Sequence, residues 1–507
     1  MVARTLARGA GKPNTSQNDA PPRWRTSLYD KQPRVFRVLC AASIVVFGAA
    51  SCSGRPVSVP VSIAPASSLR VQNKLSTSSL IQHVVIIVQE NRSFDNLFAT
   101  FPGADGATKG RMERHGPVKL REANLVEKCD FGHSYGGFKR DYDRGKMNGF
   151  DLEGDSYGCP NPAGILPYQY VNPEQIVPYW FMAEQYVLAD QMFQTHGSDS
   201  YTAHQDLIRG GTMIDQNQTE SLIDTPTALP WGCDAPAGTT TSLLIWTGSK
   251  LQRGKGPFPC TNQFPSSGSY YPTLRDLLDA KSVSWKYYSP RVGNHRGHGS
   301  GAYWNAFDTI AAVRYGSEWG TNVPGAPYYE KQIFYDISGG TLPAVSWLIP
   351  DDVNSDHPGS GSDTGPSWAA SVVNAIGQSP YWNTTAIIVV WDDWGGFYDH
   401  VPPPFFDHWG GLGFRVPMIV VSPYPRQAVP IKPGYISHTQ YEFASILEFV
   451  EDTFGLGRLG TTDRRATSMV DCFDFTQGPR PFQKIPSSYS RSYFLHQPES
   501  LRPVDSE

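Results

Sequence analysis

Two long apolar runs, each followed at once by polar side chains, constrain the fold of this chain more than any other feature. The first covers residues 84–88 and the second covers residues 385–391. Runs this rich in Val and Ile predict strands that are buried on both faces, as in a parallel sheet. A sheet built from such strands needs helices on both sides, so the two runs favour an α/β fold.

Further strands and helices alternate along the chain. Strands are predicted at residues 283–288, 342–349 and 416–421, and helices at residues 179–193, 271–280, 367–376 and 441–454. The alternation predicts a mostly parallel central sheet flanked by helices. The chain also contains 48 Gly and 42 Pro residues, which predict long loop insertions between the core elements.

Oxygen-bearing side chains follow three of the predicted strands. The carboxyl ends of parallel strands meet at one edge of a sheet, and ligands bind there in open α/β folds. Several carboxylates so close together would repel one another, and a divalent cation removes that repulsion. The sequence therefore predicts a metal site, whose candidate ligands come in three pairs: Glu90 and Asn91, Asp351 and Asp352, and Asp392 and Asp393.

A serine with a histidine four residues later forms the candidate catalytic segment. Ser200 is a good N-cap for a helix that begins near Tyr201, which taken alone is a structural role. Two features favour catalysis: a helix N-terminus attracts anions such as phosphate, and His204 lies one turn further along the same face. Beside a metal ion, the pattern indicates phosphoryl or sulfuryl transfer, with Ser200 as nucleophile and Thr202 as the competing hydroxyl.

Composition restricts the class of protein further. The 507 residues carry a formal net charge of −4, which gives no signature of nucleic-acid binding. No two of the seven Cys residues have the C-x-x-C spacing of a zinc site. Two local pairs in Gly- and Pro-rich loops are candidates for disulfides in an exported chain, with the pairing left open by the sequence: Cys129 and Cys159, and Cys233 and Cys260.

An export segment is predicted at residues 1–52. Residues 1–35 are polar and basic, and the apolar run at 38–52 is short for a transmembrane helix but suits a signal peptide. The run ends in small residues before Cys52, as in a bacterial lipoprotein; a plain signal peptide or a single anchor is the alternative. Residues 53–78 read as a flexible linker. We therefore expect an exported protein of the bacterial periplasm, cell envelope or extracellular space, with a lipid anchor at Cys52 as one option.

Several motifs match a known family. Residues 90–95 read Glu-Asn-Arg-Ser-Phe-Asp and residues 392–400 read Asp-Asp-Trp-Gly-Gly-Phe-Tyr-Asp-His; further matches lie at residues 130–133, 145–150, 200–204, 283–288 and 415–423. Together they resemble the bacterial phosphoesterase family that contains phospholipases C and a class of acid phosphatases, within the alkaline-phosphatase superfamily. The resemblance covers about residues 79–456 and implies an alkaline-phosphatase-like sandwich as the catalytic domain. It leaves residues 457–507 as an accessory tail.

The resemblance also implies roles for individual residues. It implies one divalent metal ion, of Ca, Mg, Mn or Zn, held by Glu90, Asn91, Asp392 and Asp393. It implies Ser200 as the nucleophile, and histidines that contact phosphate or donate protons at His133 and His357, with His204 and His298 as further candidates. Asp352, His357 and His438 resemble the ligands of a second ion in superfamily members that hold two.

The chain departs from the family pattern in two places. The nucleophile follows Ser198 and Asp199 where the family usually has Gly-Pro, and Asp199 would disfavour a dianionic phosphate, which leaves room for a diester preference. Where some members have Asp-Glu-His, this chain has Asp392, Asp393 and Trp394. The shorter second acid could change the metal preference.

These expectations converge on an exported metal-dependent hydrolase of phosphoric esters that resembles phospholipase C. A broad-specificity acid phosphatase is the alternative enzyme, and an envelope binding protein with the same fold is the alternative without catalysis. The expected partner is a phosphate-ester or phospholipid substrate, reached through a membrane surface in the second case, and nucleic acid is not expected. A sulfatase is disfavoured because the chain has no Cys/Ser-x-Pro-x-Arg segment.

Overall fold

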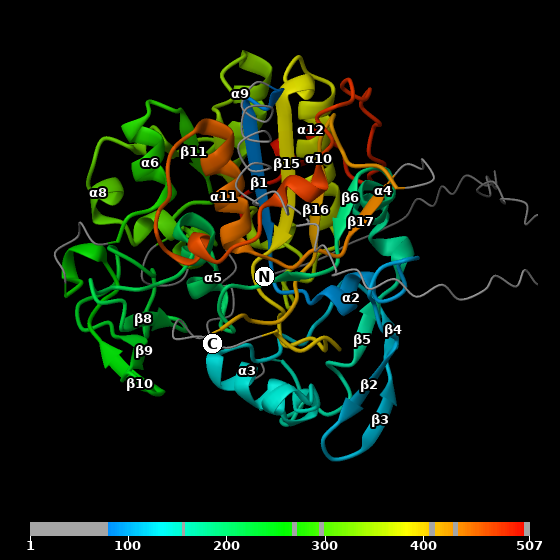
Figure 1. Ribbon diagram of the computed structural model, residues 1–507, viewed down its shortest axis with the longest axis vertical. Helices are drawn as coiled ribbons and strands as arrows, with labels where there is room; N and C mark the ends of the chain where they lie inside the picture. Colours follow the sequence, from blue (N-terminus) through cyan, green and yellow to red (C-terminus); the bar gives the residue numbers. More distant parts are fainter. Residues whose placement is uncertain are drawn as a thin grey trace, which may run out of the picture. The chain divides into compact units, whose positions relative to one another are not determined.

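A seven-stranded sheet forms the centre of the computed structural model, which describes residues 80–154, 158–265, 271–293, 299–404, 411–428 and 434–500 (Figure 1). From one edge to the other, its strands are β11 (Trp285–Tyr288), β14 (Val345–Leu348), β1 (His83–Gln89), β15 (Thr385–Trp391), β16 (Met418–Val421), β6 (Val187–Ala189) and β17 (Tyr435–Ser437). The two long apolar runs are β1 and β15. They pair in the interior of the sheet, with His83 beside Thr385 and Gln89 beside Trp391.

Six of the seven strands run in the same direction. β1 is parallel to β14 and β15, β11 is parallel to β14, and β17 is parallel to β6. β16 is antiparallel to both of its neighbours, β15 and β6. The chain leaves β15 at the carboxyl edge of the sheet and enters β16 from that same edge, so β16 has to run back. The predicted mostly parallel sheet is confirmed, and β16 is its one reversed strand.

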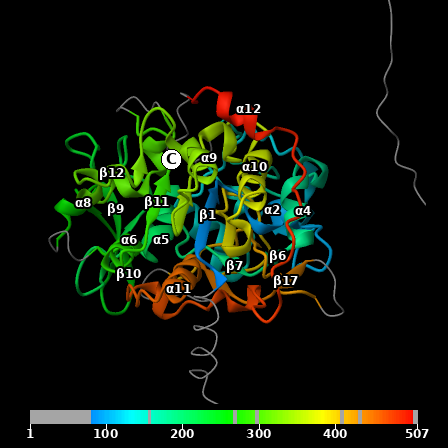
Figure 2. The same cartoon turned by 90° about the horizontal axis from the view of Figure 1, so that it is seen from above.

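Helices cover both faces of the sheet, as Figure 2 shows. The α-helices are α2 (Phe94–Phe98), α3 (Tyr135–Tyr142), α4 (Val177–Gln185), α5 (Ser200–Arg209), α6 (Leu274–Ala280), α7 (Gly301–Trp304), α8 (Ala311–Arg314), α9 (Gln332–Gly339), α10 (Gly365–Gly377), α11 (Phe443–Phe454) and α12 (Arg491–His496). On one face, α10 contacts α4, α9 and α12; on the other face, α5 packs against α11. The predicted α/β architecture is therefore confirmed.

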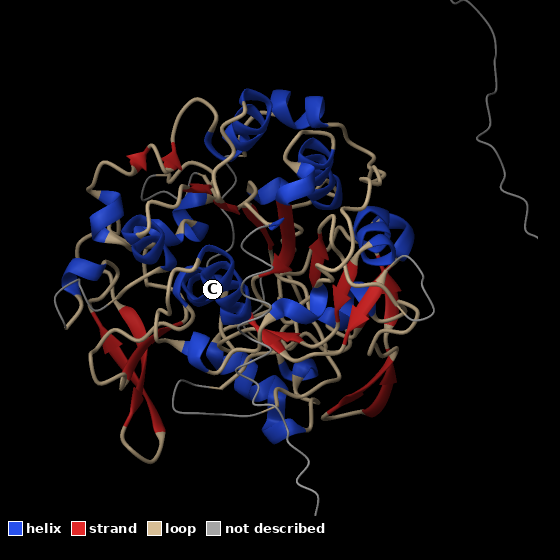
Figure 3. Ribbon diagram, turned by 45° about the horizontal axis from the view of Figure 1, so that its top comes forward, coloured by secondary structure: helices blue, strands red, loops and turns tan. Residues whose placement is uncertain are grey.

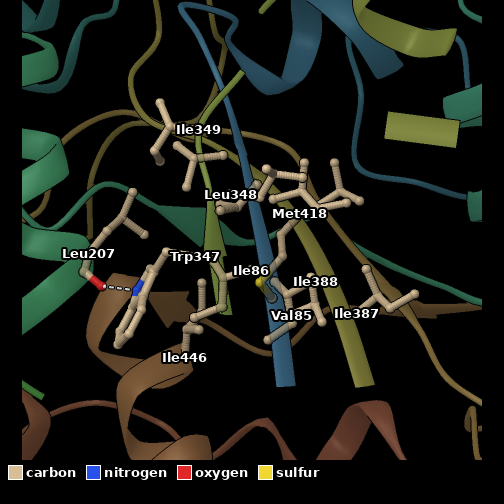
Figure 4. Close-up of a cluster of buried hydrophobic side chains, with 14 of the residues drawn as sticks. Val85, Ile86, Leu207, Trp347, Leu348, Ile349, Ile387, Ile388, Met418 and Ile446 are labelled. Atoms are coloured by element: carbon tan, nitrogen blue, oxygen red, sulfur yellow. Dashed lines mark hydrogen bonds between the residues drawn. The ribbon is translucent and has the colours of Figure 1, made fainter. Parts of the chain in front are cut away.

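The core is built from the side chains of the central strands. Every residue of β15, and every residue of β1 after His83, is buried. Each fully buried Val or Ile side chain stabilises the fold by about 1.5–3 kcal/mol. Figure 4 shows how the helices join this core: Trp347 of β14 lies near Ile446 of α11, and its indole Nε1 donates a hydrogen bond to the carbonyl oxygen of Leu207 in α5 at 3.1 Å. This contact fixes α5 against the sheet.

Smaller sheets arise within the long insertions (Figure 3). One has three strands, β8 (Glu220–Ile223), β9 (Thr241–Trp246) and β10 (Leu251–Gly256). The others are pairs: β2 (Lys109–Met112) with β3 (Gly116–Lys119), β4 (Arg121–Ala123) with β5 (Gln169–Val171), β7 (Met192–Phe193) with β18 (Tyr441–Glu442), and β12 (Trp319–Gly320) with β13 (Val323–Pro324). The predicted loop-rich connections between core elements are thus present.

The structure corrects the prediction of one helix over residues 179–193. α4 ends at Gln185, the chain turns at Tyr186, and β6 begins at Val187. Apolar residues occupy most positions on both sides of this boundary, so hydrophobic spacing gives no signal for the end of the helix. The helix ends here because the following residues form β6, which pairs with β16 and β17. That pairing is a tertiary contact, which local spacing does not reveal. The other predicted helices are present with their ends moved by a few residues.

Two disulfides join the cysteine pairs that the sequence singled out, Cys129 with Cys159 and Cys233 with Cys260. The predicted signal segment and linker, including Cys52, lie outside the described residues. Within the part of the chain that is described, no helix combines the length and the hydrophobicity needed to cross a membrane.

Residues 457–500, predicted as an accessory tail, pack against the α/β domain. Arg480 Nη1 donates a hydrogen bond to the carbonyl oxygen of Gln185, at the end of α4, at 2.8 Å. The ring of Phe494 in α12 meets the indole of Trp368 in α10 edge-on, with 5.3 Å between centroids. The backbone N–H of Ser500 donates to the Asp351 carboxylate at 2.6 Å. The tail therefore covers α10 and reaches the carboxyl end of β14.

Candidate active site

The ends of β1 and β15 bring together the four residues expected to hold a metal ion. Because the two strands pair in register, Glu90 and Asn91 leave β1 at the level where Asp392 and Asp393 leave β15. The backbone N–H of Asn91 donates a hydrogen bond to Asp392 Oδ1 at 2.9 Å. All four side chains are buried. The structure thus groups them at the carboxyl edge of the sheet.

Three oxygen atoms of this group have no hydrogen-bond partner among the described residues: Glu90 Oε2, Asn91 Oδ1 and Asp392 Oδ2. An unsatisfied buried polar group costs about 1–3 kcal/mol, and more when it is charged. Burial and the negative charge of Asp392 raise the pKa of Glu90 well above its ordinary value. Divalent cations bind carboxylate and amide oxygens. The unpartnered oxygens therefore fit a divalent metal ion.

His204 also faces these oxygens. Its Nε2 lies 3.0 Å from Glu90 Oε1 and 3.8 Å from Asp392 Oδ2. One ligand atom from each of Glu90, His204 and Asp392 lies within 4.8 Å of the other two. Burial lowers the pKa of His204 to about 4, so the imidazole is neutral at pH 7. The sequence predicted His204 as a catalytic candidate, and the structure places it among the possible metal ligands.

Ser200 is the first residue of α5, and the N-cap is Asp199. The sequence predicted Ser200 itself as the cap, so that prediction is wrong by one residue. The difference matters because the Ser200 hydroxyl does not act as the N-cap of α5. Its Oγ donates a hydrogen bond to Asp393 Oδ2 at 3.2 Å. The Ser200 hydroxyl therefore lies at the N-terminus of a helix and directly contacts the carboxylate of Asp393.

The neighbours of Ser200 are held by other contacts. Asp199 Oδ2 accepts a hydrogen bond from the backbone N–H of Thr225 at 2.7 Å. The competing hydroxyl, Thr202, is buried, and its Oγ1 accepts a hydrogen bond from Ser198 Oγ at 3.1 Å. Of the two hydroxyls, Ser200 is the one with a hydrogen bond to a candidate ligand.

Of the other predicted histidines, His133 contacts the group directly, whereas His357 Nε2 lies 3.9 Å from Asp130 Oδ2. His133 Nε2 lies 3.0 Å from Asn91 Nδ2 and 3.6 Å from Asp393 Oδ2. Its Nδ1 lies 2.8 Å from the carbonyl oxygen of Phe131, which is the partner of an Nδ1–H donor. His357 is held in the same way, with Nδ1 2.6 Å from the Pro358 carbonyl oxygen. In the neutral form, both rings therefore present an unprotonated Nε2.

Backbone geometry at the end of β1 fixes the site. Asn91 has φ of 60°, in the left-handed region that few residues other than glycine adopt. Gly395 (φ 57°) lies against it, and a Cβ at Gly395 would overlap the Asn91 carbonyl oxygen. Arg92 Nη2 then donates a hydrogen bond to the carbonyl oxygen of Asp356 at 2.8 Å, immediately before His357. Arg92 thus connects the end of β1 to the segment that carries His357.

A second acidic cluster beside the site already has a counter-charge. Asp95, Asp399 and His400 offer ligand atoms close to one another. However, Arg415 Nε donates to Asp399 Oδ1 at 3.0 Å, and Arg415 Nη2 lies 3.5 Å from Asp95 Oδ1. His400 Nδ1 lies 2.8 Å from Asp95 Oδ2. This cluster is therefore a buried ion-pair network, and it braces the turn after β1.

The residues proposed for a second ion are not brought together. His438 is 64% exposed at its side chain, and its Nδ1 contacts Asp190 Oδ2 at 2.8 Å. Asp352 and His357 are buried. Across the described ranges, these three residues form none of the groups whose ligand atoms come within 4.8 Å of one another. His298 lies outside the described residues.

Asp351, from the third predicted acid pair, is satisfied by hydrogen bonds. Its Oδ1 accepts from Ser300 Oγ at 2.9 Å, and its Oδ2 accepts from the Ser500 N–H at 2.6 Å. These contacts give the carboxylate a structural role at the end of β14, between the α7 segment and the C-terminal tail.

Trp304 is a site residue that sequence reasoning did not mark. Its ring lies 6.5 Å from the ring of His204 in nearly parallel planes, and 5.7 Å from the ring of His357. It therefore packs against two of the candidate histidines. No spacing or neighbouring motif distinguishes it from the other 12 Trp residues, since a total of 13 occur in the chain.

These features define an α/β protein with a candidate cation site and an adjacent serine at the carboxyl edge of its sheet. The model of the Phosphoesterase family matches residues 81–457, which is most of the chain. The chain therefore belongs to the Phosphoesterase family, and the resemblance seen in the sequence motifs is confirmed.

Relatives of known name share about a quarter of its residues. The chain is 24% identical over 453 residues to a non-hemolytic phospholipase C of Burkholderia pseudomallei, covering 78% of this chain and 58% of that protein. It is 24% identical to a non-hemolytic phospholipase C of Pseudomonas aeruginosa, covering 85% and 62%. It is 26% identical to phospholipase C A of Mycobacterium tuberculosis, covering 79% and 78%. The chain thus spans less than two thirds of the first two relatives.

Among solved structures, the chain is similar to a protein in the alkaline phosphatase superfamily from Vibrio parahaemolyticus. The two are 11% identical, the match covers 77% of this chain and 72% of that one, and the TM-score is 0.33. A TM-score this low carries no argument about the site, and the α/β architecture stands on the sheet described above.

Proposed function

We propose that this chain is an exported, metal-dependent hydrolase of phosphoric esters that acts as a phospholipase C, with Ser200 as its nucleophile. One observation carries the proposal. The Ser200 hydroxyl stands at the N-terminus of α5 and donates a hydrogen bond at 3.2 Å to Asp393, beside three buried oxygens that have no partner among the described residues. The names of the relatives supply the substrate class.

The metal ion would be held by Glu90, Asn91, Asp392 and Asp393. When bound, such an ion offsets the negative charge of the phosphate ester and of the attacking hydroxyl. Before substrate binds, the carboxylate of Asp393 already accepts a hydrogen bond from the Ser200 hydroxyl. Asp393 is therefore placed to take the proton of that hydroxyl.

The chain's own residues account for the two halves of the reaction. In the first half, Ser200 Oγ bonds to phosphorus, its proton passes to Asp393, and the bond to the leaving alkoxide breaks. A histidine donates a proton to that alkoxide. In the second half, a water gives a proton to the deprotonated histidine and its oxygen bonds to phosphorus. The bond between Ser200 Oγ and phosphorus breaks, the phosphate leaves, and Ser200 takes back the proton held by Asp393. The N-terminus of α5 would stabilise the phosphate, because the first N–H groups of a helix have no acceptor within the helix and favour anions.

His357 and His133 are the candidates for the proton donor. Burial lowers the pKa of His357 to about 4, so the free protein holds it neutral at pH 7. A bound phosphate brings negative charge beside the ring, which raises the pKa of an imidazole and favours its protonated form. Each ring is fixed by its Nδ1 contact to a backbone carbonyl, at Pro358 and Phe131. His133 Nε2 then lies 3.6 Å from Asp393 Oδ2, and His357 Nε2 lies 3.9 Å from Asp130 Oδ2.

A substrate panel tests the proposal with the metal-loaded protein. The panel contains phosphatidylcholine, a simple phosphomonoester and a simple phosphodiester. We expect Ser200→Ala to lower kcat by at least about 10⁴-fold, as for other nucleophiles that act as a unit with their partners, while metal content stays the same. Thr202→Val is the matched variant, since Thr202 lies half a turn away, and it should keep turnover and phosphoserine formation.

The outcomes separate the candidate functions. Hydrolysis of phosphatidylcholine with release of phosphocholine supports the phospholipase C, whereas turnover of the phosphomonoester alone makes the protein an acid phosphatase. Turnover that survives Ser200→Ala would move the nucleophile to Thr202 or to water. Failure of the metal-loaded wild type on the whole panel would leave an envelope binding protein.

Export is part of the same proposal. The disulfides Cys129–Cys159 and Cys233–Cys260 support it, because disulfides persist in oxidising compartments. Fractionation of cells tests it directly. Membrane-bound protein that Cys52→Ala releases would identify a lipid anchor, and recovery in the cytosol would refute export.

A further inference from the structure

His204 occupies an unusual position for a residue that only supports a nucleophile. It lies one helical turn after Ser200 on α5, and its ring lies close to oxygens at the ends of β1 and β15. Its Nε2 is 3.0 Å from Glu90 Oε1 and 3.8 Å from Asp392 Oδ2. The imidazole is 2% exposed, so the contact forms away from water.

Several oxygen atoms near His204 Nε2 lack a hydrogen-bond partner among the described residues. Glu90 Oε2, Asn91 Oδ1 and Asp392 Oδ2 have no hydrogen-bond partner among the residues described, and all are buried. The contact with Glu90 Oε1 leaves all three unsatisfied. Ligand atoms of Glu90, His204 and Asp392 all lie within 4.8 Å of one another, so the imidazole of His204 is close enough to share an ion with these oxygens.

The ring of His204 is also held in place. Trp304 lies alongside it at 6.5 Å, with 14° between the planes. α5 itself is anchored to the sheet through Trp347, which hydrogen-bonds the Leu207 carbonyl oxygen. A ligand held on a rigid element loses little conformational freedom when it binds an ion, which favours binding.

We propose that His204 Nε2 is a direct ligand of the metal ion, which makes the site a mixed nitrogen–oxygen site that prefers Zn²⁺ to Ca²⁺ and Mg²⁺. Imidazole suits Zn²⁺ and other transition ions, whereas Ca²⁺ and Mg²⁺ take oxygen ligands. Sites made only of carboxylate, amide and hydroxyl oxygens lack this preference. The inference rests on the cation site of the proposed function and names the ion it selects.

The competing explanation is that His204 only orients Glu90 through a hydrogen bond. Both explanations expect lower activity when His204 is changed, so activity does not separate them. Metal selectivity and the spectrum of the bound ion do, because only a direct ligand places a nitrogen in contact with the metal.

Metal binding is measured on the full chain without substrate, by competition between Zn²⁺ and Ca²⁺ in equilibrium dialysis. Wild type should prefer Zn²⁺ by at least about 100-fold, in line with the softness of an imidazole ligand. His204→Gln should lose at least about 10-fold in Zn²⁺ affinity and change Ca²⁺ affinity by less than about 3-fold. His83→Gln is the control, since His83 lies at the opposite end of β1, where its Nδ1 contacts the Pro343 carbonyl oxygen.

Electron paramagnetic resonance of one bound Cu²⁺ per chain gives the second readout. Nitrogen coupling should appear in wild type, change when the protein is labelled with ¹⁵N-histidine, and vanish in His204→Gln. The labelled wild type needs no variant and shows whether a histidine nitrogen contacts the ion, so misfolding of His204→Gln leaves that part of the test intact. His133→Gln should retain the coupling, which separates His204 from the other histidine near the ligands.

Each outcome has one meaning. An unchanged Zn²⁺ to Ca²⁺ ratio in a folded His204→Gln, or nitrogen coupling that survives it, refutes His204 as a ligand and leaves the proposed hydrolase standing. A Zn²⁺ preference without hydrolysis of any ester refutes the hydrolase and leaves the ligand assignment standing. A wild-type chain that binds no divalent ion refutes both.

Discussion

Arg92→Met should destabilise the protein more than any surface ion-pair change, because Arg92 is a buried cross-link between three loops. Its Nε and Nη2 donate to the carbonyl oxygen of Asp356 at 3.1 and 2.8 Å, and Nη2 also donates to the carbonyl oxygen of Leu125 at 2.8 Å. Its Nη1 donates to Asn96 Oδ1 at 3.2 Å, and its guanidinium lies 4.9 Å from the centre of the Phe397 ring.

The expected cost follows from these contacts. Methionine fills much of the arginine volume but donates no hydrogen bond, so the carbonyl oxygens of Asp356 and Leu125 lose their Arg92 donors. An unsatisfied buried acceptor costs about 1–3 kcal/mol, which gives about 2–6 kcal/mol for two. Urea unfolding at pH 7, followed by tryptophan fluorescence, measures the free energy. We also expect kcat to fall, since His357 follows Asp356 directly.

Arg253→Met is the matched control for this measurement. Arg253 is also an arginine in an ion pair, with Asp224, but its side chain is 44% exposed. A pair of that kind contributes about 0.2–1 kcal/mol. If Arg92→Met and Arg253→Met lower the free energy of unfolding equally, Arg92 does not hold the loops together and the reasoning is wrong.

Three further predictions test other parts of the structure. Gly197→Ala should lower kcat and cost about 1–3 kcal/mol, as overpacking does, because a Cβ at Gly197 would overlap the ring of Phe138 just before α5; equal melting temperatures and kcat would contradict this. Burial lowers the pKa of His400, but its hydrogen bond and charge contact with Asp95 outweigh burial and raise the pKa above 6.5. The stability from this pair is therefore complete below pH 6.5 and lost as pH rises through the raised pKa, so wild type should lose more stability than His400→Gln between pH 6 and pH 8 in urea titrations. Chelation with EDTA should lower the melting temperature of wild type, and an ion present at 100 times its dissociation constant is worth about 2.7 kcal/mol; Glu90→Gln should show a smaller shift, and no shift in wild type would argue against the ion.

The sheet was predictable because its central strands carry a strong local signal. Residues 84–88 and 385–391 are too apolar for any place but the interior, and β1 and β15 occupy it. The direction of β16 was not predictable, because an apolar run reads the same in both directions. Its reversal depends on the connection from β15, which stays at one edge of the sheet.

The site was predictable where strand ends alone determine it. Glu90 and Asn91 meet Asp392 because their strands are neighbours in register. The position of His438 was not predictable, since its exposure depends on how β17 lies at the edge of the sheet. The same holds for Trp304, whose contact with His204 joins segments about 100 residues apart and has no counterpart in local spacing.

The position of β1 in the sheet has a consequence for how the protein is made. Both neighbours of β1 lie far downstream, since β14 begins at Val345 and β15 begins at Thr385. At a synthesis rate of about 5–20 residues per second, β1 waits about 15–60 s before β15 is complete. Until Leu348 has been synthesised, this apolar strand has neither of its partners, and long-range pairing of this kind is slow and exposed to aggregation. Although β1 is the first strand of the sheet to be made, the sheet therefore closes only when most of the chain has been synthesised.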